Sequence, residues 1–185
     1  DDLSRGLGDV YKRQLEFSLM KARLEIYYEN IPANALRLFE SKYAENPSDA
    51  NLYGLALAYK KNNNFNEGLA SLDKLLEKYP KNLVLNTTKV EFLSYFNKFN
   101  DALDLANKFL EISPKNYPLS ISKSQILLNM GQYFESEEII RDQLLRKNDS
   151  PDLWFMLSET QKTSQNIVGY HQSRAEYFLL LGQDE

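Results

Sequence analysis

The chain has 185 residues, 43% of them hydrophobic and 26% charged, which is typical of a folded domain long enough to bury one sizeable core. Its net charge of −4 disfavours nucleic acid as the main partner, because nucleic-acid-binding domains carry a basic face. The absence of cysteine excludes disulfides, thiolate metal sites and cysteine nucleophiles. No apolar run approaches the length of about 18 residues that a membrane-spanning helix needs, so we predict no span.

Residues 1–14 differ from the rest of the chain, because they show no helical periodicity and match no repeat position. We interpret them as translated adaptor sequence, with a natural disordered leader as the alternative, and we exclude them from the fold prediction. The domain is then expected over 15–185. If the natural start lies upstream, the lack of a signal peptide in this sequence carries no information.

Apolar residues recur at helical spacing in the remainder and predict five helix pairs. In chain order the pairs are 15–29 with 32–45, 49–61 with 66–78, 83–96 with 100–112, 117–130 with 134–147, and a fifth pair that begins at Pro151. Pro32 and Pro151 suit the first turn of a helix. Ser48 or Asp49 is expected to cap the third helix, and Ser150 the ninth. The last helix, 167–181, is expected to run long.

A repeat of 34 residues organises these pairs, since Phe65, Phe99 and Tyr133 each follow a short polar turn at that spacing. A small residue follows each aromatic three positions later: Gly68, Ala102 and Ser136. This helix–turn–helix period is the signature of tetratricopeptide (TPR) repeats, which stack because one helix pair cannot bury its apolar face alone. We therefore predict an all-α, right-handed solenoid of about four and a half TPR units, at 15–47, 48–80, 81–114, 115–150 and an incomplete 151–185.

The last unit departs from the repeat pattern. Tyr170 stands where a small residue is expected, 34 residues after Ser136. Gly182-Gln183 resembles the turn that opens a further helix, so we expect the array to continue past the end of this sequence.

Three segments carry a narrower resemblance: 17–23 (FSLMKAR), 53–59 (YGLALAY) and 171–183 (HQSRAEYFLLLGQ). In this order they resemble the C-terminal TPR domain of bacterial periplasmic zinc metalloproteases, the family that includes the beta-barrel assembly-enhancing protease. The resemblance implies an upstream domain with His-Glu-x-x-His, in which two imidazoles hold zinc and the Glu is the general base. It also implies a periplasmic location and docking to the outer-membrane protein assembly machinery and its clients. Composition alone leaves the cytoplasm open.

This chain has one histidine and no His-Glu-x-x-His, so we expect no cofactor here and zinc only in the parent protein. We interpret His171 as an ordinary helix residue, because no further ligands lie at metal-binding spacing. Glu137 and Glu138 are expected on a solvated face, since adjacent helix residues point about 100° apart. The aromatics at repeat positions are expected in the core: Phe65, Phe99, Tyr133, Phe109 and Trp154.

The inner groove is the candidate binding site, because the first helix of each unit lines the concave surface of such solenoids. The repeat phase places twelve residues there: Tyr53, Leu57, Lys60, Lys61, Thr87, Glu91, Ser94, Tyr95, Ile121, Gln125, Asn129 and Phe155. Aromatics and amides with few charges suit an extended or helical polypeptide; ordinary exposed surface is the alternative. TPR clamps for C-terminal carboxylates need Lys, Asn or Arg at positions that Tyr53 and Leu57 occupy, which disfavours that ligand.

We therefore predict a protein–protein interaction domain that engages a protein or an unfolded polypeptide client. The first hypothesis is a docking domain of a periplasmic zinc metalloprotease in outer-membrane protein quality control. The first alternative is a stand-alone TPR scaffold without a protease. Enzymatic activity in this chain is the second alternative, and the sequence offers no cluster of nucleophile, base and metal ligand to support it.

Overall fold

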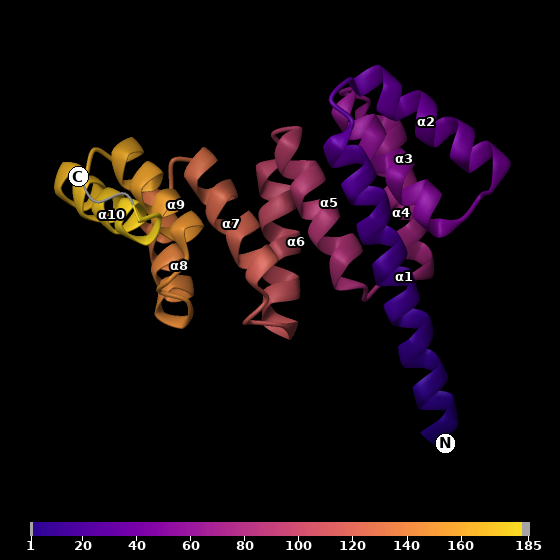
Figure 1. Ribbon diagram of the computed structural model, residues 1–185, viewed down its shortest axis with the longest axis horizontal. Helices are drawn as coiled ribbons and strands as arrows, with labels where there is room; N and C mark the ends of the chain where they lie inside the picture. Colours follow the sequence, from indigo (N-terminus) through magenta and orange to yellow (C-terminus); the bar gives the residue numbers. More distant parts are fainter. Residues whose placement is uncertain (1, 183–185) are drawn as a thin grey trace. The chain divides into compact units, whose positions relative to one another are not determined.

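The computed structural model describes residues 2–182, and within that range the chain forms ten α-helices and no strand (Figure 1). The chain divides into two compact units, residues 1–92 and residues 93–185. Successive helices are joined by short turns of a few residues, as expected for helical hairpins.

Unit 1 is built around its third helix. Its helices are α1 (Asp2–Tyr28), α2 (Pro32–Glu45), α3 (Asp49–Lys61), α4 (Phe65–Lys78) and most of α5 (Leu83–Tyr95). Three helices, α1, α2 and α4, pack against α3, and every residue from Leu52 to Ala58 is buried. A helix surrounded in this way needs no polar stripe, which explains why residues 53–59 are apolar on all sides.

Two glycines allow close helix contacts in unit 1. A Cβ on Gly54 would lie 1.9 Å from Cε1 of Phe39, so α3 approaches α2 too closely for any larger residue. A Cβ on Gly68 would lie 2.6 Å from Cε2 of Phe92, which also contacts the Phe65 ring at 5.7 Å. At Gly68, the small residue expected three positions after Phe65 therefore makes room for an aromatic ring of a neighbouring helix.

Unit 2 stacks its helices in chain order. They are α6 (Phe99–Ile112), α7 (Tyr117–Asn129), α8 (Tyr133–Arg146), α9 (Pro151–Thr163) and α10 (Ile167–Leu180), and each packs on the next. A core cluster of Ile140, Leu144, Leu153 and Leu157 joins α8 to α9. Ser124 and Ser136 are both buried and hydrogen-bond to each other, with 2.9 Å between their Oγ atoms, which joins α7 to α8.

The 34-residue repeat is most regular in the turns inside the helix pairs. Asn63, Asn97, Gly131 and Gln165 have φ angles of 60°, 58°, 77° and 62°, and they lie 34 residues apart. The left-handed conformation is cheapest for Gly and tolerated by Asn, which explains why Asn or Gly stands at this position in the second, third and fourth pairs. Gln165 occupies the fourth position, which the sequence pattern alone did not identify.

The predicted helices after α1 are confirmed, and none of their bounds differs from the predicted one by more than one residue. Ser48 caps α3, with its Oγ accepting a hydrogen bond from the Asn51 amide at 3.2 Å. Ser150 occupies the N-cap of α9, but its side chain makes no capping bond. The expectation of a helix beginning at Leu15 was wrong, because α1 already begins at Asp2 and projects beyond the other helices of unit 1 (Figure 1).

The prediction of a long final helix was also wrong. Helix α10 has 14 residues, as α8 does. Its buried positions are Gly169 and Ser173, whereas the repeat phase pointed to Tyr170. Gly169 therefore takes the role of the small residue, since a Cβ there would lie 2.7 Å from Nε2 of Gln161. Gln183 lies outside the described residues.

The predicted core aromatics differ in burial. Phe109 is buried, and Trp154 is half-buried against the core cluster of unit 2. Phe65, Phe99 and Tyr133 are half-buried at the first residue of their helices. These three therefore cover the ends of the helix pairs and do not fill the core centre.

Candidate functional site

The groove residues predicted in unit 1 are largely occupied by internal contacts. Tyr53, Leu57 and Thr87 are 0%, 8% and 7% exposed, so the prediction that they line an open surface was wrong. Because α1 packs directly on α3, it covers the face that the repeat phase had assigned to a ligand. Lys60, Lys61 and Glu91 are half-buried.

Arg23 organises the polar side of this packing and joins three helices of unit 1. Its Nε donates to Tyr53 Oη at 3.0 Å, its Nη2 to Thr88 Oγ1 at 2.7 Å and its Nη1 to Glu91 Oε2 at 3.0 Å. Tyr53 Oη and Thr88 Oγ1 are themselves 2.9 Å apart. The Arg23 network therefore holds α1, α3 and α5 together through one guanidinium, whose planar set of donors suits three acceptors at once.

Burial and neighbouring charges together shift the pKa values of Arg23, Tyr53 and Lys60. Burial by itself lowers the pKa of the Arg23 guanidinium, but Tyr53 and Glu91 outweigh it and the net pKa is raised. Burial raises the pKa of the Tyr53 phenol, with Arg23 and Thr88 opposing. Burial also lowers the pKa of Lys60, which Glu91 opposes and Arg23 reinforces. Two cations thus share one carboxylate in a partly dry setting.

Lys61 is engaged at the end of a helix. Its Nζ donates to the carbonyl oxygens of Ile26, at 3.0 Å, and of Glu29. Ile26 lies in the last turn of α1 and Glu29 directly follows the helix, so the Lys61 cation satisfies unpaired acceptors there and complements the helix dipole. Lys61 therefore contributes to the packing of α1 on α3.

The groove residues predicted in unit 2 are more accessible. Tyr95 and Phe155 are 48% and 39% exposed, and Gln125 and Asn129 are also exposed. Gln125 Nε2 donates to Asn129 Oδ1 at 3.2 Å, which aligns the two amides along α7. Ile121, by contrast, packs against the core cluster of unit 2, and Ser94 is half-buried.

A buried polar network joins α8, α9 and α10. Gln161 is 0% exposed; its Nε2 donates to Glu137 Oε1 at 3.0 Å and its Oε1 accepts from Ser173 Oγ at 2.7 Å. Glu137 also accepts two hydrogen bonds from Arg141, at 2.9 and 2.7 Å. The expectation of a solvated face holds for Glu138 but was wrong for Glu137, because Gln161 draws it into the interface between helices.

An aromatic cage surrounds a second arginine in unit 2. The guanidinium carbon of Arg174 lies 5.0 Å from the ring centres of Phe155 and Tyr177 and 4.9 Å from that of Phe178. We call these four residues the Arg174 cage. Residues 174, 177 and 178 are three and four positions apart, which brings their side chains to one helix face. This spacing is visible in the sequence, where it forms part of the segment 171–183 that carries the family resemblance.

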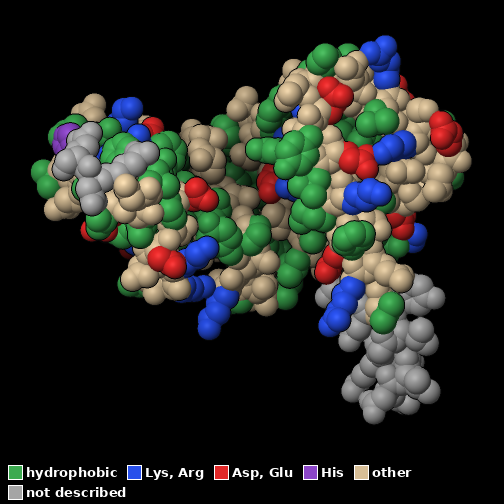
Figure 2. Space-filling view, viewed as in Figure 1, with side chains coloured by type: hydrophobic (Ala, Val, Ile, Leu, Met, Phe, Trp, Pro, Cys, Tyr) green, Lys and Arg blue, Asp and Glu red, His purple; other side chains and the backbone are tan. Residues whose placement is uncertain are grey.

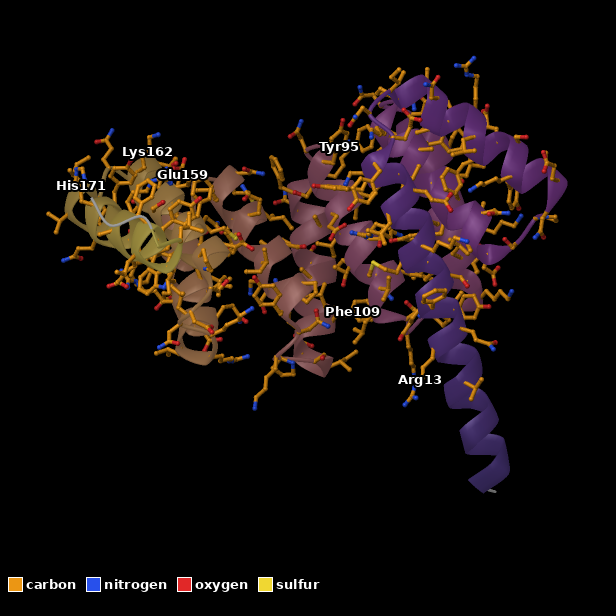
Figure 3. The ribbon with its side chains drawn as sticks, viewed as in Figure 1. Arg13, Tyr95, Phe109, Glu159, Lys162 and His171 are labelled. Carbon is orange, nitrogen blue, oxygen red and sulfur yellow. The ribbon has the colours of Figure 1, made fainter. Side chains whose placement is uncertain are left out.

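The residues described provide few features of a catalytic or metal site. No group of three or more His, Cys, Asp or Glu in this part of the chain could hold a metal ion. His171 is exposed and projects from α10 (Figure 3). Acidic and basic side chains are interspersed on the face shown in Figure 2, with no extended patch of one sign. Among these residues, no helix is both long and apolar enough to cross a bilayer.

Solved structures with the same fold include TPR proteins. A thermophilic TPR protein of Thermus thermophilus superposes with a TM-score of 0.72 at 19% identity, covering 92% of this chain and 93% of its own. PilW, a widely conserved type IV pilus biogenesis factor, also gives 0.72, at 15% identity over 92% of this chain and 79% of its own. A MamA mutant gives 0.61, at 19% identity over 95% and 93% of the two chains. No protein-family model and no curated protein matches the sequence.

At these identities the comparisons establish the fold, which is an all-α helical solenoid of TPR type. TPR units present side-chain surfaces of stacked helix pairs to protein partners. Of the predicted groove residues in unit 2, Gln125, Asn129, Phe155 and Tyr95 are exposed.

Proposed function

We propose that this chain is a polypeptide-binding TPR module that contacts its partner through the first helices of the pairs in unit 2. The observation that carries the proposal is the contrast between the two units. In unit 1 the corresponding positions, Tyr53 and Leu57, are buried under α1, whereas Gln125, Asn129 and Phe155 keep their side chains at the surface. The paired amides on α7 offer hydrogen bonds to the backbone of an extended or helical segment, and the exposed Phe155 ring on α9 offers apolar contact.

Site-specific photo-crosslinking tests this proposal. A benzophenone amino acid replaces Asn129 on α7 in one sample and Asn100 on α6 in a matched control; both asparagines are exposed and lie in unit 2. Each protein is mixed with a displayed library of random 12-residue peptides that has been selected for binding to the unmodified chain. We expect crosslinks from position 129 and few from position 100. Equal crosslinking from both would refute a binding face on the first helices.

A finer proposal concerns the parent protein. The resemblance of 17–23, 53–59 and 171–183 to periplasmic zinc metalloproteases supports a role as the docking half of such an enzyme, acting on outer-membrane protein assembly. Zinc and the catalytic Glu would then belong to the upstream domain, and this chain would bind clients without cutting them. Translation of the genomic reading frame upstream of Leu15 tests this: a signal peptide with His-Glu-x-x-His supports it, and a frame lacking both refutes it.

The second candidate is a stand-alone scaffold, which the likeness to a pilus biogenesis factor favours because that protein has the same fold over 92% of this chain. A scaffold would retain peptide binding and lack any attached protease. The reading-frame measurement separates the two candidates, and the crosslinking experiment bears on both.

A further inference from the structure

The Arg174 cage has a geometry that its packing role leaves unexplained. Phe155 comes from α9, whereas Tyr177 and Phe178 lie one turn after Arg174 on α10. The rings also contact one another, with centroids 5.4 Å apart for Phe155 and Tyr177 and 5.2 Å apart for Tyr177 and Phe178. Three rings therefore fix one guanidinium where α9 and α10 meet, and cation–π attraction supports that position.

Apart from the three rings, this guanidinium has no hydrogen-bond acceptor and no carboxylate partner among the described residues. The structure contains no hydrogen bond and no ion pair for Arg174 within residues 13–182, and its Nη1 is buried without an acceptor. The Nε and Nη2 atoms of Arg174 are not among the buried atoms that lack a hydrogen-bond partner. A guanidinium offers five N–H donors and attracts carboxylates in a paired geometry. A half-buried cation that lacks an acceptor is costly to maintain.

Another half-buried arginine, Arg23, shows how the same fold satisfies such a group. Arg23 has a ring within reach, Tyr53 at 6.0 Å, and in addition three hydrogen bonds, one of them to the carboxylate of Glu91. Arg174 has the rings and lacks the carboxylate. The missing element at the Arg174 cage is therefore an acidic group, and the described part of the chain does not supply one.

The surroundings of the Arg174 cage define the rest of the ligand. Phe155 is 39% exposed, and Leu181, one turn beyond Phe178, is 45% exposed. Apolar surface on both helices flanks the cation, so a ligand that carries only charge would leave these side chains in water. A carboxylate next to an apolar side chain complements both features.

We propose that the Arg174 cage binds an Asp or Glu side chain of a partner polypeptide, with an adjacent apolar side chain of that partner seated on Phe155. This rests on the proposed function, because it names the chemistry that the polypeptide must have. It places the selective contact at the α9–α10 pair, in the same unit as the amides of α7, and it requires no carboxylate clamp in unit 1.

Paired peptide libraries test the proposal with the full chain. One library displays 12-residue peptides with a single fixed Glu flanked by random apolar residues, and its partner library carries Gln at the fixed position. We expect the wild-type chain to prefer Glu over Gln by about ten-fold, the scale of one charge-assisted hydrogen-bonded pair. Arg174→Gln should abolish that preference. Arg146→Gln, which removes an exposed arginine paired with Asp142 in the same unit, should leave it intact.

The outcomes separate this proposal from the broader one. If peptides bind and crosslink at position 129 but show no preference for Glu, or if Arg174→Gln keeps the preference, the acidic-ligand proposal fails while polypeptide binding stands. If no peptide binds at all, both fail. If sedimentation shows a dimer of the wild-type chain that Arg174→Gln dissociates, the occupant is a second copy of this chain and the proposal fails.

Thermal stability separates ligand binding from a purely structural role, because replacing an arginine that is needed for packing would lower the Tm. Arg174→Met keeps the apolar stem against the rings and removes the unpaired charge. We expect its Tm to equal or exceed that of the wild type, while the Glu preference is lost. A drop in Tm of more than about 5 °C, roughly 1 kcal/mol for a unit of this size, would show that the cation is needed for packing and would overturn a ligand-binding role.

Discussion

Gly54→Ala gives the sharpest test of the packing in unit 1, because two local effects have opposite signs. Alanine is a better helix former than glycine by about 1 kcal/mol in a helix interior, so sequence-based reasoning predicts stabilisation. In the structure the new Cβ would lie 1.9, 2.3 and 2.6 Å from three ring atoms of Phe39. Phe39 is 1% exposed, so its ring has no solvent-side space into which to move.

The magnitude follows from these distances. Real Cβ contacts are essentially never below 3.0 Å, so α2 and α3 must separate by about an ångström or the ring must leave its site. Overpacking of this kind costs about 1–3 kcal/mol, and loss of a buried Phe costs about 3–5 kcal/mol. After subtraction of the propensity gain, we expect a net loss of about 2 kcal/mol, which corresponds to a Tm decrease of about 10 °C in a unit of fewer than 100 residues.

Circular dichroism melts combined with hydrogen-exchange mass spectrometry measure the effect, the second method because the two units need not unfold together. Exchange should accelerate in peptides from α2 and α3. Gly54→Ala combined with Phe39→Leu should recover part of the loss, since the smaller side chain vacates the space of the new methyl group. Glu40→Ala, at an exposed position of α2, is the control. A Tm that rises in Gly54→Ala would refute the close approach of the two helices.

Three further predictions concern polar contacts of unit 1. Arg23→Met should destabilise unit 1 by about 2 kcal/mol in urea denaturation, because it leaves Glu91 partly buried without its cation, and adding Glu91→Gln should recover part of this loss. Burial raises the pKa of Asp49, but hydrogen bonds from Lys78 and Tyr79 outweigh it and hold the pKa below the usual 3.8. This stabilisation is therefore complete above the unfolded-state pKa and disappears as the pH falls through the folded-state pKa. Asp49→Asn should lower the Tm at pH 7, and its difference from the wild type should shrink as the pH falls below 3.8. Lys61→Met should accelerate amide exchange at the C-terminal end of α1, with a loss of about 1 kcal/mol; unchanged exchange there would show that its carbonyl contacts contribute nothing.

The sequence alone was sufficient for the fold because its signals are local and repeated. Asn63 and Asn97 stand where the turn needs the left-handed backbone conformation, which few residue types tolerate. Pro32 and Pro151 each begin a helix. Such signals act within a few residues, so they fix where helices begin and end. The same locality explains the error at the N-terminus, where helical periodicity was the wrong criterion for a helix that begins at Asp2.

The candidate site depended on which helix covers which face, and that is decided by contacts between residues far apart in the chain. The repeat phase assigned Tyr53 and Phe155 the same role, yet Tyr53 is buried where α1 packs on α3, whereas Phe155 is 39% exposed. Composition cannot separate the two cases, because both are aromatic residues on first helices. Likewise, Arg23 and Arg174 look alike in sequence, and only tertiary packing gives one a carboxylate and leaves the other with three rings and no acceptor among the described residues.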